Sequence, residues 1–212
     1  MITGEFETQP SREEAEKIEQ GRRLVNEVGV FATKKITEEK MSPQERGHVT
    51  AFAASAKPAF SLNKIRPELT GELSEILARG GINLIRAEQY IINSELLLAR
   101  AENEKEFAKL VGWDFNADVE RNVKIGLSGN KKDLFRGFIL GFPLSVSLGY
   151  QNEQKFPRDK RHLTSQMMGI YTPFGDECYA FRVYPPEGKD AEDVQALIKK
   201  VDAKFAALGF VK

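Results

Sequence analysis

The segment Gly137-Phe-Ile-Leu-Gly-Phe-Pro-Leu-Ser-Val-Ser-Leu-Gly-Tyr150 decides the fold, because it combines strong apolar character with a complete lack of charge. A membrane-spanning helix needs about 20 apolar residues, whereas this segment has 14, with three glycines, one proline and two serines among them. Pro143 cannot continue a helix without losing a backbone hydrogen bond. We therefore expect two buried helices that meet at a bend near Pro143, in the core of a soluble protein.

The composition is that of a globular chain. Of its 212 residues, 41% are hydrophobic and 29% are charged, which is enough apolar material for a sizeable core. The 31 basic and 31 acidic residues give a net charge of zero, which argues against a protein that coats nucleic acid. Cys178 has no second cysteine to pair with, and the charged N-terminus has no apolar signal-peptide core. These features predict a soluble cytoplasmic protein.

The beginning of the chain, residues 1–56, is predicted to be a helical N-terminal extension. Ser11 and Glu14 have the spacing of a capping box, and few apolar residues follow them, so we expect a peripheral first helix. Ser42 followed by Pro43 predicts the start of a second helix. The rest of the chain, residues 57–212, is expected to form one α+β domain that opens with a short strand.

The middle of that domain allows two interpretations. Residues 82–92 and 95–101 are predicted to form a β-hairpin, and one long helix through both segments is the alternative. Residues 151–177 are expected to form a long, mostly irregular connection. The alternation in Cys178–Tyr184 predicts a strand.

The clearest helix of the chain is predicted after Asp190. It ends at Gly209, where Phe210 is expected to fold back as in a Schellman cap. The expected fold class is therefore α+β, with one small mixed or antiparallel sheet of about four strands packed against several helices.

Common motifs for nucleotides and metals are missing from the sequence. Neither the Walker glycine loop nor the dinucleotide-binding Gly-x-Gly-x-x-Gly pattern occurs. The two histidines, His48 and His162, have no neighbours at ligand spacing, so we predict no metal site and no cofactor. Gly126-Leu-Ser-Gly129 resembles the Gly-x-x-Gly loop that holds nucleic acid in KH domains. A helix end followed by a turn is the interpretation that we favour there over a nucleic-acid site.

No catalytic set can be identified from the sequence. A dyad of Cys178 and His162 would require the 151–177 connection to fold back over the strand. Asp176 and Glu177 precede the cysteine and would disfavour its thiolate. A packing role for Cys178 is therefore the favoured interpretation.

Candidate ligand-binding residues are Arg136, His162 and Arg182. Both arginines lie beside large apolar residues in the sequence, where a guanidinium can bind a carboxylate or a phosphate, and His162 ends a short basic patch that begins at Lys155. We predict a groove between the helices of Phe135–Tyr150 and the strand of Cys178–Tyr184.

The function predicted from this groove is that of a non-enzymatic binding or interaction module. Its partner would be a small anionic ligand or another protein, and a homo-oligomer is left open. A small enzyme without a recognisable motif is the alternative, and weak RNA binding through the KH-like loop is a second one.

The segment Leu140-Gly-Phe-Pro143 resembles part of a group of small, uncharacterised bacterial and archaeal proteins. These proteins carry a leucine-glycine-aromatic-proline segment ahead of a small residue, and some have cysteines where this chain has Leu144 and Ser145. The resemblance covers residues 57–150 loosely. It implies a compact α+β fold and implies no activity.

Overall fold

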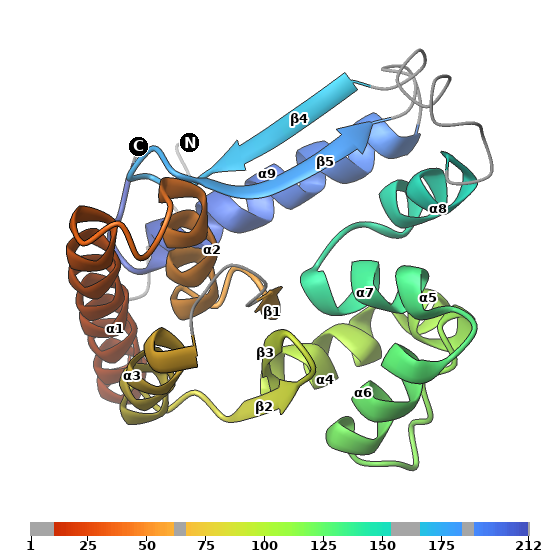
Figure 1. The fold of residues 1–212 in the computed structure, drawn as a ribbon, viewed down its shortest axis with the longest axis horizontal. Coiled ribbons are helices and arrows are strands. Elements are labelled where there is room, and N and C mark those ends of the chain that lie inside the picture. Colours follow the sequence, from red (N-terminus) through yellow and green to blue (C-terminus); the bar gives the residue numbers. More distant parts are fainter. Residues whose placement is uncertain (1–10, 62–66, 154–165, 184–188, 212) are drawn as a thin grey trace, which may run out of the picture.

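The computed structural model describes residues 11–61, 67–153, 166–183 and 189–211 and has an α+β fold (Figure 1). The helices are α1 (Arg12–Thr37), α2 (Pro43–Ala53), α3 (Pro67–Arg79), α4 (Ser94–Asn103), α5 (Lys105–Leu110), α6 (Val119–Ser128), α7 (Lys132–Leu140), α8 (Leu144–Glu153) and α9 (Lys189–Ala207). The strands are β1 (Ala59–Ser61), β2 (Leu84–Ala87), β3 (Tyr90–Asn93), β4 (Gln166–Tyr171) and β5 (Glu177–Val183). Within these described ranges, no helix is long and apolar enough to cross a bilayer.

The strands form two antiparallel sheets, where the sequence had predicted a single one. The first has the order β1-β3-β2, and the second pairs β4 with β5. In Figure 1 the β4–β5 hairpin lies at the top with α9 behind it, and α4 to α7 lie on the opposite side of the molecule. The helix α2 packs closely on β5, and the β4–β5 sheet is separate from β1-β3-β2.

The hairpin predicted for residues 82–101 is only half correct. Strands β2 and β3 do pair, but they turn at Glu88 and Gln89, before the predicted turn. The second predicted strand, residues 95–101, is a helix instead, because the Asn93 side chain accepts a hydrogen bond from the Leu96 amide and caps α4. Leu97 and Ala101 then recur at helical spacing and are buried.

The connection predicted to be irregular contains regular structure in its described part. The helix α8 extends into it as far as Glu153, and β4 pairs with β5 with Gly169 opposite Ala180. A tight turn joins the two strands, since the Thr172 amide donates to the Asp176 carbonyl over 2.8 Å. The basic patch from Lys155 to His162 lies outside the described residues.

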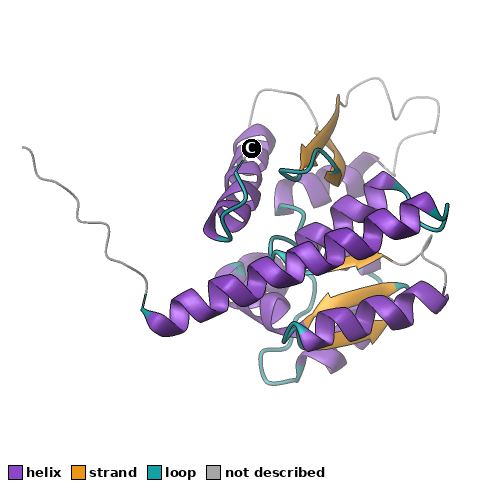
Figure 2. Cartoon of the chain, turned by 90° about the vertical axis from the view of Figure 1, so that its left-hand side faces the viewer, coloured by secondary structure: helices purple, strands orange, loops and turns teal. Residues whose placement is uncertain are grey.

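The N-terminal helices contribute to the core, contrary to the prediction that the first one is peripheral. Both predicted helix starts are confirmed, because Ser11 with Glu14 and Ser42 with Glu45 form capping boxes. Figure 2 shows α1 crossing the front of the molecule. Its thin apolar stripe (Leu24, Val25, Val28 and Ala32) is buried in the same cluster as residues of α2, α3, β5 and α9. A narrow stripe is enough because helices pack on it from more than one side.

The predicted cap at the end of α9 is confirmed. The Phe210 amide donates to the Phe205 carbonyl and the Gly209 amide donates to the Ala206 carbonyl, which is the Schellman pattern, and Gly209 has a positive φ of 80°. The Phe205 and Phe210 rings also pack together at a centroid distance of 6.4 Å.

Two hydrophobic clusters make up the core, and buried cations lie where they meet. The Lys57 ammonium donates to the Cys178 carbonyl over 2.9 Å and lies 4.2 Å from the centre of the Tyr179 ring. The Arg100 guanidinium donates to the Phe142 carbonyl over 2.6 Å and to Glu104 over 2.7 Å. Burial lowers the pKa of both cations, to about 8 for Lys57.

Replacing Gly47 by alanine should destabilise the protein. Gly47 faces β5, and an added Cβ would lie 2.7 Å from the carbonyl carbon of Glu177. We expect the free energy of unfolding of Gly47→Ala to fall by about 1–3 kcal/mol. Gly29→Ala is the matched control, because Gly29 lies in α1 with no neighbour within 4 Å. The control should gain about 0.5–1 kcal/mol in urea denaturation, and equal effects of the two changes would contradict the close packing of α2 on β5.

Replacing Lys57 by methionine should change how stability depends on pH. The folded pKa of about 8 lies below the ordinary lysine pKa of 10.5, so the unfolded chain binds more protons between these values. The free energy of unfolding of the wild type should therefore rise from pH 8 to pH 10.5. The Lys57→Met protein should lack this contribution and be more stable at pH 7 by up to about 3 kcal/mol. If the free energies of unfolding of the two proteins changed in parallel over this pH range, the pKa of Lys57 would not be lowered in the folded protein.

Candidate functional site

A cavity of about 370 Å³ lies where α7, α8, β3 and β5 meet. The residues that line it are Tyr90 of β3, Asp133, Arg136, Gly137 and Leu140 of α7, Phe142, Val146, Ser147 and Tyr150 in and before α8, and Ala180 of β5. Its walls are mainly apolar and aromatic, with charged groups from α7. This combination is common in sites for small molecules.

The bend between α7 and α8 gives this cavity its shape, and the sequence prediction of two helices with a bend there is confirmed. The helix α7 ends at Gly141, whose φ of 88° is in the left-handed region that favours glycine. The Phe142 amide donates to the Gly137 carbonyl, which completes a Schellman motif. A Cβ on Gly141 would lie 2.5 Å from the Tyr179 hydroxyl, so a larger residue would clash as well as strain the backbone.

Glycine also allows the two helices to approach each other. A Cβ on Gly137 would lie 2.9 Å from the Ser147 Cβ, so α7 and α8 contact one another at this point without an intervening side chain. The Ser147 hydroxyl donates to the Pro143 carbonyl of its own helix over 3.0 Å. The tight crossing brings Gly137 and Ser147 together in the lining of the cavity.

Arg136 supplies the positive charge of the cavity. Its Nη1 donates to the Asp133 carboxylate over 3.1 Å, and the two side chains are 35% and 49% exposed. The buried Nε has no acceptor among the described residues. A buried donor without a partner is uncommon in folded proteins. Because this Nε is buried, a ligand can reach the guanidinium only through the exposed part of the side chain, which is 35% exposed.

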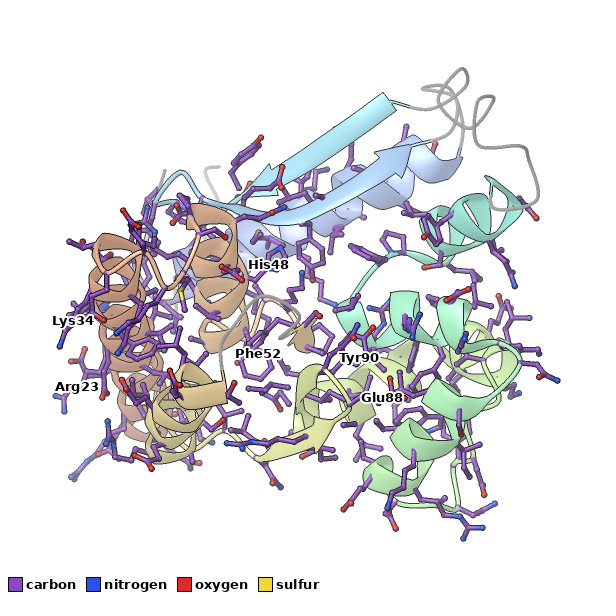
Figure 3. The ribbon with its side chains drawn as sticks, viewed as in Figure 1. Arg23, Lys34, His48, Phe52, Glu88 and Tyr90 are labelled. Carbon is purple, nitrogen blue, oxygen red and sulfur yellow. The ribbon has the colours of Figure 1, made fainter. Side chains whose placement is uncertain are left out.

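Two tyrosines add polar atoms to the cavity. Tyr90 is only 3% exposed, and its hydroxyl accepts a hydrogen bond from the Gln89 side chain over 3.1 Å. Figure 3 shows Tyr90 on the side of the hairpin that faces α7. Burial raises the pKa of Tyr90, so its hydroxyl stays protonated at neutral pH. Tyr150 is 49% exposed and also lines the cavity.

Two larger pockets are lined by charged side chains, most of which form ion pairs with one another. One, of about 640 Å³, lies between α1 and α3, where Arg23 pairs with Glu19 and Arg79 with Glu27. The other, of about 930 Å³, lies between α4, α8 and α9. There Arg100 pairs with Glu104, and the Ser145 hydroxyl donates to Asp193 over 2.6 Å. Arg136 is likewise paired, with Asp133, so its cavity differs from these two in the aromatic lining of Tyr90, Phe142 and Tyr150.

Of the three residues predicted to bind a ligand, Arg136 can be placed in the cavity. Arg182 lies in β5 opposite Met167, and its side chain is outside the described residues, as is the whole of His162. The predicted groove was to lie between the helices of Phe135–Tyr150 and the strand of Cys178–Tyr184, and the cavity contacts both elements.

The other candidate residues from the sequence, Gly126 and Cys178, lie in buried, packed positions. Gly126 is buried within α6, where an added Cβ would lie 2.5 Å from the Phe135 ring, so the first glycine of the KH-like motif makes a helix contact. Cys178 is fully buried, and its thiol donates to the Ile170 carbonyl over 3.3 Å. Among the described residues, no three histidine, cysteine or acidic side chains gather as metal ligands would.

Sequence reasoning missed Tyr90, Asp133 and Ala180 as cavity residues. Asp133 had a usable signal, because it lies three residues before Arg136 and so on the same face of a helix. Tyr90 and Ala180 had none, since only the tertiary fold brings β3 and β5 to the same helices.

Comparison with known protein families, with curated proteins and with solved structures finds no match for this chain, so the cavity has to be interpreted from its own geometry.

Proposed function

We propose that this chain is a cytoplasmic, non-enzymatic binding protein, and that it holds a small ligand with an apolar body and an anionic group in the cavity between α7, α8 and β5. The observation that carries the proposal is the partly exposed Arg136 guanidinium in the lining of an aromatic-walled cavity. A planar guanidinium in such a position is well suited to a carboxylate or phosphate.

The size and lining of the cavity support a ligand of modest size. A volume of about 370 Å³ is near the lower end for small-molecule sites, which suits a single ring with a short polar arm. Phe142 and Leu140 offer apolar contact, while Arg136 and the Tyr90 hydroxyl offer the polar contacts that fix orientation.

Two chemical interpretations of the sequence, the Cys178–His162 dyad and the KH-like loop, receive no support from the site. Cys178, the nucleophile of the predicted dyad, is fully buried and is not among the residues that line the cavity. For RNA binding, the KH-like loop would have to present backbone amides to phosphates, but Gly126 is helical and packed against Phe135.

Arg136 should be needed for binding of a simple aromatic carboxylate. We expect 3-phenylpropionate to bind the wild type and to bind Arg136→Gln about tenfold or more weakly, since a charge-assisted hydrogen bond is lost. Isothermal titration or ligand-observed NMR would measure this. Arg121→Gln is the matched control, because Arg121 is an exposed arginine of α6 that does not line the cavity. Equal affinities of the wild type and Arg136→Gln would contradict the proposed role of the guanidinium.

Filling the cavity should abolish binding without removing any charge. Ala180 lines the cavity from β5, and a phenylalanine suits a strand position. We expect Ala180→Phe to fold, as judged by circular dichroism and its urea midpoint, and to lose measurable binding of 3-phenylpropionate. Retained binding in a folded Ala180→Phe protein would place the ligand elsewhere on the chain.

A further inference from the structure

The carboxylate of Asp133 lies beside the guanidinium that would bind the ligand. The two residues are three positions apart in α7, their side chains are 3.1 Å apart at the closest atoms, and both line the same cavity. The polar end of the cavity therefore presents a positive and a negative group side by side. Tyr90 lines the same cavity.

A ligand with only a negative group is poorly matched to this arrangement. Its carboxylate would approach Arg136 within a few ångströms of the Asp133 carboxylate, and two like charges at such a distance repel each other. A ligand with only a positive group would approach Asp133 close to Arg136, and these two positive charges would repel each other. The match improves when the ligand carries both charges, because its ammonium can pair with Asp133 while its carboxylate pairs with Arg136.

The existing pair between Asp133 and Arg136 does not prevent such an exchange. Both side chains are partly exposed, and an ion pair of this kind contributes little to stability because water screens it. A ligand that offers each group a new partner therefore loses little by separating them. The buried Nε of Arg136 is left without an acceptor by the present pairing.

We infer that the ligand of this cavity is a zwitterion with an apolar side chain, such as a free hydrophobic α-amino acid. Its ammonium and carboxylate would lie at Asp133 and Arg136, and its side chain would lie among Leu140, Phe142, Val146 and Tyr150. This inference rests on the proposed function, because it assigns the chemical class of the ligand to the same cavity.

The test compares three compounds with the same phenyl ring and a similar chain: L-phenylalanine, 3-phenylpropionate and 2-phenylethylamine. Titration of the full chain with each, by calorimetry or NMR, should give the tightest binding for L-phenylalanine. We expect the two singly charged compounds to bind about tenfold more weakly, since each lacks one charge-assisted contact. The preference should fall at high salt, because both contacts are partly exposed.

Two variants separate the contributions of the charges. Asp133→Asn should remove the preference for L-phenylalanine over 3-phenylpropionate, and Arg136→Gln should remove the preference for L-phenylalanine over 2-phenylethylamine. Glu120→Gln removes an equivalent exposed charge from the first turn of α6 and should leave all three affinities unchanged. Ala180→Phe should abolish binding of L-phenylalanine.

The outcomes distinguish this inference from the proposed function. If 3-phenylpropionate binds at least as tightly as L-phenylalanine and depends on Arg136, the zwitterion inference is wrong and the anion-binding proposal stands. If none of the three compounds binds at millimolar concentration, or if binding survives in Ala180→Phe, both are wrong. A preference for L-phenylalanine that persists in Asp133→Asn also overturns the inference, because the ammonium would then have another partner.

Discussion

The close approach of Gly141 to the Tyr179 hydroxyl is the constraint on which the site depends. The α7–α8 bend can approach β5 this closely only because residue 141 has no side chain and takes a left-handed conformation. The Tyr179 hydroxyl in turn donates to the Ala56 carbonyl over 3.2 Å, which fixes the ring from the other side. The bend therefore sets the distance between α8 and β5, and the cavity lies in the space between them.

Buried cations reinforce the same junction. Arg100 donates to the Phe142 carbonyl and lies 5.1 Å from the centre of the Phe138 ring, while Lys57 lies against Tyr179 and Phe142. Both cations lose hydration when they are buried, which lowers their pKa values. Such groups contribute less net stability than an apolar pair of the same size would, but they require specific partners. Arg100 contacts both clusters, because it lies against the Phe107 and Phe138 rings of one and donates to the Phe142 carbonyl beside the other.

Features that depend on residues close together in the sequence were predicted better than the other features of the fold. Helix starts at Ser11 and Ser42 were predictable, because capping depends on residues three positions apart. The strand Glu177–Val183 was predictable from alternation. The helix after Asn93 was missed because a cap and a strand end have similar sequence signals, and β4 was missed because Met167, Met168 and Gly169 show no alternation.

The sequence by itself determined the α+β class, the bend after α7 and the presence of an arginine next to apolar residues there. Each of these follows from short-range chemistry: periodicity, a proline and a glycine within three residues, and the spacing of caps. The tertiary structure alone decided that the strands form two sheets and that β3 and β5 meet α7 and α8 around Arg136. That outcome depends on contacts between residues far apart in the chain, such as Tyr90, Arg136 and Ala180, which no local pattern specifies.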